Sequence, residues 1–200
     1  MGYHRAGFDV VGVDNRPQPH YPFEFHQGDA MTWPLAGFDA IHASPPCHDW
    51  IRGGSHKPDG TGWLLAATRA RLEPPAVPWV IENVPGAPLR SDYRLCGCMF
   101  GLEIPGIGRL KRERWFETSW AGFQLRSPCN HRGPAISVVG HGTTTYARGK
   151  LGRNPAIAEY RALMGGIDWM NRDELSQAIP PQYTEYIGGQ LMAYLREHAA

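Results

Sequence analysis

The chain has 200 residues, 42% of them hydrophobic and 20% charged, with a formal net charge of +1 at pH 7. That length is enough for one domain with a sizeable core. No apolar run is long enough to span a membrane, and no signal peptide is visible. The four cysteines lack the spacing of a secreted disulfide scaffold, so we expect a cytoplasmic protein. We also expect a monomer.

The first segment predicts a helix end followed by a strand. Residues 2–6 read as the last turn of a helix that Gly7 closes. Residues 8–13 read as a strand that ends at Asp14. A carboxylate at the tip of such a strand can accept both ribose hydroxyls of a nucleoside, although an acid in a turn before Asn15 is also common.

The next strand leads into a loop that carries a cysteine. Residues 38–42 read as a short buried strand, and residues 43–48 follow as Ala-Ser-Pro-Pro-Cys-His. Pro45 and Pro46 end the strand because neither can donate a backbone hydrogen bond. Cys47 therefore lies at the carboxyl edge of a strand, which suits a nucleophile, although a cysteine beside a turn is often a core residue.

A helix and a second strand come after this loop. Residues 61–73 predict a helix, because apolar side chains recur at helical spacing and Pro74 ends the pattern. Residues 77–84 predict a strand with Glu82 near its end. An acid inside an apolar strand is costly to bury without a partner, so Glu82 is a candidate functional residue rather than a surface carboxylate.

Four stretches in order resemble the DNA (cytosine-5) methyltransferases. They are the Pro46-Cys47 loop, the strand end Glu82-Asn83-Val84, the pair Arg112-x-Arg114 and, in a diverged form, residues 178–183 with the sequence Ala-Ile-Pro-Pro-Gln-Tyr. The resemblance covers nearly the whole chain. It implies an α/β fold with a Rossmann-like S-adenosylmethionine-dependent methyltransferase sheet, and methylation of carbon 5 of a flipped cytosine in double-stranded DNA.

The resemblance also implies a role for each matching residue. Cys47 would be the nucleophile that adds to carbon 6 of the base, Glu82 would protonate N3, and Arg114 would place a cation near O2. Arg112 belongs to the same catalytic set, as a supporting residue rather than a base contact. The implied contacts to S-adenosyl-L-methionine are Asp14 for the ribose, Asp29 for the adenine amino group, Pro45 and Pro46. Asp29 after Gly28 is by itself ordinary turn chemistry.

The resemblance divides the chain into three parts. Residues 1–118 form a catalytic α/β core, residues 119–153 a small target-recognition region, and residues 154–200 the C-terminal helices. We predict a strand at residues 112–117 that carries both arginines on one face, and a loop with Arg52 and Lys57 that closes over the target base. Asn154 is expected to cap a helix that ends near Gly165, and a last helix is expected to open at Pro180 and Pro181 and run to about Glu197.

One family element is absent from this sequence. The family opens with a strand and a glycine-rich loop that encloses the methionine part of the cofactor, and the strand normally lies between those ending at Asp14 and near Ser44. We therefore expect that residue 1 lies inside a longer reading frame, or that the protein is a degenerate, non-catalytic DNA-binding remnant. The 200 residues by themselves are expected to bind the cofactor weakly or not at all. Thymidylate synthase is an alternative family, because its nucleophilic cysteine also follows a proline. The motifs that follow this cysteine in that family are not found in this sequence.

Charge along the chain is uneven. Residues 109–153 contain nine Lys or Arg and two acids, Glu113 and Glu117, which gives this segment a net charge of +7 and leaves −6 for the rest. A basic segment on a nearly neutral protein predicts a docked polyanion, here DNA, although a solvated face has the same composition.

Two cysteine pairs raise the question of zinc. Cys96-Gly97-Cys98 and Cys129-Asn130-His131 contain the ligands of a Cys₃His site. Structural zinc sites usually place two or more residues between paired ligands, and residues 95–102 also resemble a family core segment that needs no metal. We therefore predict no metal site and leave the alternative open.

Overall fold

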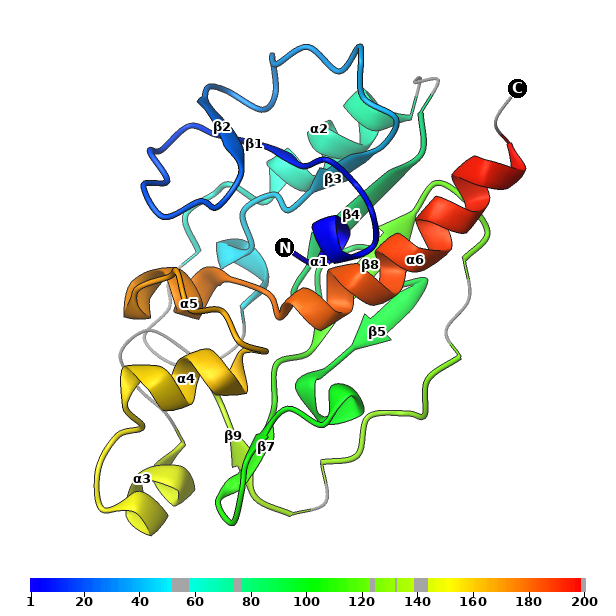
Figure 1. Ribbon diagram of the computed structural model, residues 1–200. Helices are drawn as coiled ribbons and strands as arrows, with labels where there is room; N and C mark the ends of the chain where they lie inside the picture. Colours follow the sequence, from blue (N-terminus) through cyan, green and yellow to red (C-terminus); the bar gives the residue numbers. More distant parts are fainter. Residues whose placement is uncertain (52–57, 74–76, 123–124, 132, 139–143, 199–200) are drawn as a thin grey trace. The chain divides into compact units, whose positions relative to one another are not determined.

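The computed structural model describes residues 1–51, 58–73, 77–122, 125–131, 133–138 and 144–198 (Figure 1). The chain forms two compact units, each built from segments that are far apart in sequence. The first unit comprises Met1–Gly28, Leu95–Arg112 and Arg126–Ala193. The second comprises Asp29–Arg94, Glu113–Leu125 and Tyr194–Ala200. The loop predicted to close over a base, residues 52–57, lies outside the described residues.

The second unit is organised around a four-stranded sheet. Its strands, in spatial order, are β3 (Ile41–Ala43), β4 (Trp79–Asn83), β8 (Arg114–Thr118) and β5 (Tyr93–Leu95). β3 and β4 are parallel, whereas β4 and β8 are antiparallel. The predicted helix is present as α2 (Trp63–Leu72), and its buried Leu65 and Leu72 pack with Trp79 and Ile81 of β4 in one apolar cluster. The central strand β4 is buried along its whole length.

The sheet also holds a buried ion pair on its α2 side. Arg69 of α2 donates from Nε and Nη2 to the two carboxylate oxygens of Glu117, at 3.0 and 2.8 Å. Burial opposes ionisation of Glu117, but the hydrogen bonds from Arg69 and from the Arg90 backbone amide, together with the charges of both arginines, outweigh it and hold the pKa of that carboxyl below its usual value. The pair is bidentate, the geometry that best compensates a buried carboxylate.

The first unit combines short strands with helices. β1 (Val11–Asp14) and β2 (Glu24–Gln27) form a parallel pair, and a second sheet has the order β6 (Glu103–Ile104), β7 (Gly108–Leu110), β9 (Ala135–Ile136). Its helices are α1 (Gly2–Arg5), the 3₁₀ turn η2 (Gly97–Phe100), α3 (Thr145–Leu151), α4 (Ile157–Leu163), α5 (Arg172–Gln177) and α6 (Pro181–Glu197), whose last residues belong to the second unit. Buried side chains of β7, β9 and α3 to α5 form its core.

The long helix α6 packs against α1 in the first unit (Figure 1). Gly188 lies where the two helices meet, and a Cβ atom there would be 2.9 Å from that of Ala6. The sequence expectations for both helices are confirmed: α1 ends before Gly7, whose φ is +98°, and α6 begins at Pro181 and ends at Glu197. Proline suits the first position of a helix because its missing N–H has no helical partner there.

Three local predictions differ from the structure. The strand expected from residue 112 begins at Arg114, because Arg112 is engaged elsewhere in the first unit. Helix α4 is preceded by Ala156 rather than Asn154, and the Glu159 carboxylate accepts from the Ala156 amide at 2.6 Å. Helix α3 was not expected, although Thr144 caps it by accepting the Ala147 amide at 3.2 Å.

The predicted α/β fold class is confirmed: among the described residues, parallel and antiparallel strands combine with helices in both units. In the described part of the chain, no helix has both the length and the apolar character needed to cross a membrane.

Candidate active site

The loop that carries Cys47 leaves β3 beside the end of β4. Because the strands are parallel and Ala43 pairs with Ile81, the carboxyl end of β3 lies next to Asn83. The Asn83 side chain donates from Nδ2 to the Pro45 carbonyl at 3.0 Å and accepts the Val84 amide at 2.9 Å. Asn83 is buried, so it holds the Pro-Pro turn in place, a role that the site prediction did not include. Cys47 itself is partly exposed.

Glu82 and Arg114 meet on one face of the β4–β8 pair. Glu82 pairs with Phe116 across the antiparallel ladder, so Arg114, two residues before Phe116, lies diagonally across on the same face. The Arg114 Nε atom is 3.0 Å from Glu82 Oε1. Their side chains are only 16% and 9% exposed, so the two opposite charges compensate each other in a place with little access to water. The structure therefore brings together two of the predicted catalytic residues.

Hydrogen bonds join the described residues that come before residues 52–57 to those that come after them. Cys47 precedes a short 3₁₀ turn, η1 (His48–Trp50). Within that turn the Asp49 carboxylate accepts the backbone amides of Asp59, Gly60 and Gly62, at 2.7 to 3.0 Å. These bonds connect residues 10 to 13 positions apart, which sequence periodicity could not reveal.

A second contact joins the same two segments. His48 Nδ1 lies 2.7 Å from Asp59 Oδ2. Hydrogen bonds from the Thr61 hydroxyl and from His48 lower the pKa of Asp59 to about 2. The residue after the cysteine is therefore hydrogen-bonded to the start of the described segment 58–73.

Arg112 lies in the first unit, away from any strand. Its guanidinium donates to the carbonyls of Val138 and Ser176 at 2.7 and 2.8 Å. The backbone carbonyl of Arg112 accepts the Tyr183 hydroxyl at 2.7 Å. The side chain is buried, with 4% exposed. These contacts join Arg112 to Val138, which follows β9, to Ser176 of α5 and to Tyr183 of α6.

His42 of β3 is a titratable group close in sequence to Cys47. Burial lowers its pKa to about 4, so its imidazole is neutral at pH 7. Its Nε2 atom is 3.0 Å from the Ser44 hydroxyl. A neutral histidine next to the Pro-Pro turn adds no charge to the loop that carries Cys47.

The two predicted cofactor carboxylates end or follow the first strands. Asp14 is the last residue of β1, and its two oxygens accept from the Arg16 amide at 2.8 Å and from Gln18 Nε2 at 3.3 Å. Asp29 accepts the Met31 amide at 2.8 Å and is exposed. A carboxylate has about four acceptor positions, so both retain capacity to bind a nucleoside.

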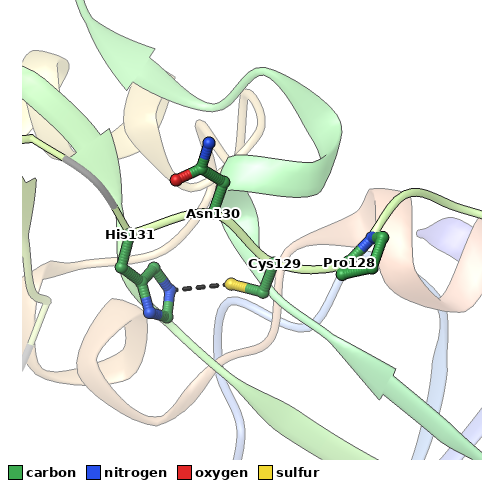
Figure 2. Close-up of a pocket in the computed structure, with 4 residues that line it drawn as sticks. All are labelled: Pro128, Cys129, Asn130 and His131. Atoms are coloured by element: carbon green, nitrogen blue, oxygen red, sulfur yellow. Dashed lines mark hydrogen bonds between the residues drawn. The ribbon is translucent and has the colours of Figure 1, made fainter.

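A cluster of three thiols and one imidazole lies in the first unit. Cys98 Sγ is 2.9 Å from Cys129 Sγ, Cys129 Sγ is 2.7 Å from His131 Nε2, and Cys96 Sγ is 3.3 Å from the same nitrogen. Figure 2 shows the Cys129 and His131 side chains pointing toward one another. Both residues, with Pro128 and Asn130, line a cavity of about 540 Å³.

The thiols of this cluster are shifted by their surroundings. Burial raises the pKa of Cys96, while the backbone amides of Cys98 and Arg112 hydrogen-bond to its sulfur and act in the opposite direction. Burial and the neighbouring Cys98 and Cys96 thiols raise the pKa of Cys129. Thiols this close repel one another once ionised, so a nearby cation would change their charge state.

Comparison with known proteins identifies the fold. No family model and no curated protein sequence matches the chain. Among solved structures, a mutant of Spodoptera frugiperda DNMT2 matches with a TM-score of 0.59 and 13% sequence identity, over 96% of this chain and 96% of that chain. The chain therefore has a DNMT2-like α/β fold.

Proposed function

We propose that this protein methylates carbon 5 of cytosine in double-stranded DNA through a covalent adduct of the Cys47 thiolate. The observation that carries the proposal is the buried ion pair of Glu82 and Arg114, because Glu82 belongs to β4, the strand next to β3, after which the Cys47 loop begins. The likeness of fold to DNMT2 supports the methyltransferase class. The order of the motifs along the chain supports cytosine as the base.

The first chemical step is addition of the thiolate to the ring. Carbon 5 of cytosine is a poor nucleophile because the ring is aromatic. When the Cys47 sulfur bonds to carbon 6, the 5,6 double bond breaks and its electron pair moves to carbon 5, while N3 takes up a proton.

Glu82 and Arg114 suit the opposite edge of the base. N3 and O2 of cytosine are both attached to carbon 2, so they are neighbouring acceptors. A carboxyl group and a guanidinium that already touch each other match this pair, with Glu82 protonating N3 and Arg114 stabilising charge on O2. Asn83 acts on the nucleophile side, because it holds the carbonyl of Pro45 and so the turn before Cys47.

S-adenosyl-L-methionine supplies the methyl group when it is bound. Asp14 would accept its ribose hydroxyls and Asp29 its adenine amino group, with Pro45 and Pro46 as further contacts. Once carbon 5 carries the methyl group, loss of its proton to a base or water expels the Cys47 sulfur. The 5,6 double bond re-forms and N3 returns its proton to Glu82, so the enzyme is regenerated.

The target base must leave the duplex to reach Cys47, so base flipping is part of the proposal. Exposed basic side chains of the segment 109–153, such as Lys111, Arg148 and Lys150, would bind the phosphates and orient the duplex.

Covalent trapping tests the proposal. The protein, expressed in full from its own gene, is incubated with S-adenosylmethionine and a duplex that contains 5-fluorocytosine. Fluorine cannot leave carbon 5 as a proton does, so the reaction should stop at a Cys47–DNA adduct that survives denaturation and is located by peptide mass spectrometry. A matched 5-fluorocytosine RNA distinguishes the two nucleic acids as substrates.

Two variants complete the test. Cys47→Ser should abolish both adduct and methyl transfer, because a hydroxyl is a far weaker nucleophile at neutral pH. Cys98→Ser, which also removes one thiol, should still form the adduct if it folds. An adduct on another cysteine, or substantial turnover by Cys47→Ser, would remove Cys47 from the nucleophile role. DNA binding without any adduct would favour a non-catalytic DNA-binding protein.

A further inference from the structure

We infer that Cys96, Cys98, Cys129 and His131 bind one structural zinc ion, a site separate from the proposed active site. Their ligand atoms, three Sγ and one imidazole nitrogen, all lie within 4.8 Å of one another. All four residues belong to the first unit, whereas Cys47, Glu82 and Arg114 belong to the second. The inference goes against our sequence prediction of no metal site.

The four ligand atoms are close enough to share one tetrahedral ion. Zinc bonds of about 2.3 Å to sulfur and about 2.1 Å to nitrogen set neighbouring ligand atoms roughly 3.5 to 3.8 Å apart. The observed S···S contact of 2.9 Å and S···N contacts of 2.7 and 3.3 Å are shorter than this, and the widest separation within the cluster is 4.8 Å. Binding of an ion would therefore require the side chains to rotate so that the short contacts widen around one centre.

The short spacing within each pair has a local explanation. Cys96 has extended backbone angles, with φ −142° and ψ 151°, and Cys98 is the second residue of the 3₁₀ turn η2 that follows it. The chain therefore turns between these two cysteines, and both sulfurs lie beside the Cys129–His131 pair. Residues 128–131 form no helix, and within them Cys129 Sγ and His131 Nε2 are 2.7 Å apart.

The surroundings of the cluster also suit metal-bound thiolates. The backbone amides of Cys98 and Arg112 hydrogen-bond to the Cys96 sulfur, and such amides stabilise a thiolate in a metal site. Arg126 Nη1 donates to the Met99 carbonyl at 2.9 Å. The segment that contains Cys129 is therefore hydrogen-bonded to η2, which contains Cys98. Four protein ligands leave no open position, which makes the site structural rather than catalytic.

A Cys98–Cys129 disulfide is the main competing account of the short S···S contact. It would need a separation of about 2.05 Å, and no disulfide is present among the four cysteines. A disulfide would also leave unexplained why the Cys96 thiol and the His131 ring converge on the same point. A zinc ion explains all four side chains together.

Metal analysis of the purified protein tests the inference. The protein is prepared without a histidine tag, and its metals are measured by inductively coupled plasma mass spectrometry. We expect one zinc per chain, released when a mercurial reagent blocks the thiols. Cys129→Ser should reduce zinc to background, whereas Cys47→Ser, which removes the one cysteine outside the cluster, should keep a full equivalent.

Two further measurements guard against a variant that simply fails to fold. Cobalt substituted into the wild-type protein should show the thiolate charge-transfer and visible d–d bands of a tetrahedral site. His131→Cys should retain zinc and shift those bands toward an all-sulfur site. Chelation should speed amide hydrogen exchange in segments 95–101 and 126–131 more than in β4.

Three outcomes would overturn the inference. They are wild-type protein without zinc whose four thiols all react freely, a Cys98–Cys129 disulfide detected by mass spectrometry, and cobalt spectra without charge-transfer bands. None of these outcomes bears on trapping by Cys47, so the inference and the proposed function fail independently.

Discussion

At the scale of single residues, the candidate site contains a buried carboxylate, Glu82, whose charge would be unfavourable without a partner. Glu82 is 7% exposed on a fully buried strand, and an uncompensated carboxylate there would be costly. The guanidinium of Arg114 at 3.0 Å makes this placement possible. Buried pairs of this kind contribute little net stability, so a functional role is the better reason for the pair.

Glu82→Gln is expected to slow methyl transfer far more than it weakens DNA binding. The amide keeps the shape of the side chain but cannot protonate N3, and general acid catalysis is worth about 10²–10⁴-fold. Single-turnover rates and DNA affinity should be measured together, with the exposed Glu73→Gln as the control for loss of a carboxylate in the same unit. An unchanged rate with weaker binding would reduce Glu82 to a base-binding residue.

His42 predicts a loss of stability in mild acid. Its pKa in the folded protein is about 4, below the ordinary 6.5. Between pH 6.5 and pH 4 the histidine is therefore protonated in the unfolded chain but neutral in the folded protein. Stability should therefore be complete above about pH 6.5 and fall as the pH is lowered toward 4. Urea unfolding across this range should show a shallower decline for His42→Gln than for wild type or for the exposed His4→Gln. Equal slopes in all three proteins would contradict this assignment.

At the scale of elements, most contacts that order the loops come from short side chains on strand and helix ends. Asn83 holds the turn after β3, Asp49 holds the return of the loop, and Asn171 caps α5 by accepting the amides of Asp173 and Glu174. Each side chain satisfies backbone groups that would otherwise lack a partner.

Two adjacent glycines of α6 give a matched test of how α6 packs on α1. Gly188→Ala would put a Cβ atom 2.9 Å from Ala6 Cβ and 3.0 Å from the Tyr3 ring, and such overpacking costs about 1–3 kcal/mol. Gly189 has nothing within 4 Å of that position, so Gly189→Ala should stabilise the helix by about 0.5–1 kcal/mol. Chemical denaturation of both variants measures the difference. Equal stability of the two variants would mean that α1 shifts away from the new methyl group at position 188 without loss of stability.

At the scale of the whole molecule, charge is more important than shape for the proposed partner. The segment 109–153 has a net charge of +7, but several of its basic groups already have protein partners. Arg112 binds carbonyls, Arg114 pairs with Glu82 and Arg153 pairs with Glu159. The exposed Arg148 and Lys150 at the end of α3 are therefore better candidates for phosphate contacts.

Replacing Arg148 and Lys150 together by glutamine should weaken binding to DNA of any sequence. Two lost phosphate contacts should reduce the slope of log affinity against log salt by about 1.8. Fluorescence anisotropy over a salt series measures the slope, with the double variant Arg5→Gln and Arg196→Gln, outside the basic segment, as the charge-matched control. An equal change in the control would show that net charge, and not this segment, governs binding.

The sequence by itself determined the fold class, the order of the candidate motifs, α2, α6 and the buried strand that carries Glu82. These features depend on hydrophobic periodicity, on proline and on short motifs, which all act within a few neighbouring residues. Arg112 illustrates the limit of such patterns. Its spacing from Arg114 predicted a shared strand face, but its guanidinium binds carbonyls 26 and 64 residues away.

Only the tertiary structure decided which distant side chains meet. Glu82 reaches Arg114 because of the β4–β8 register, and Asn83 reaches Pro45 because β3 and β4 are parallel. Likewise, Cys96 and His131 converge although 35 positions separate them. Register and packing are set by the summed burial of whole faces, so no local pattern contains them.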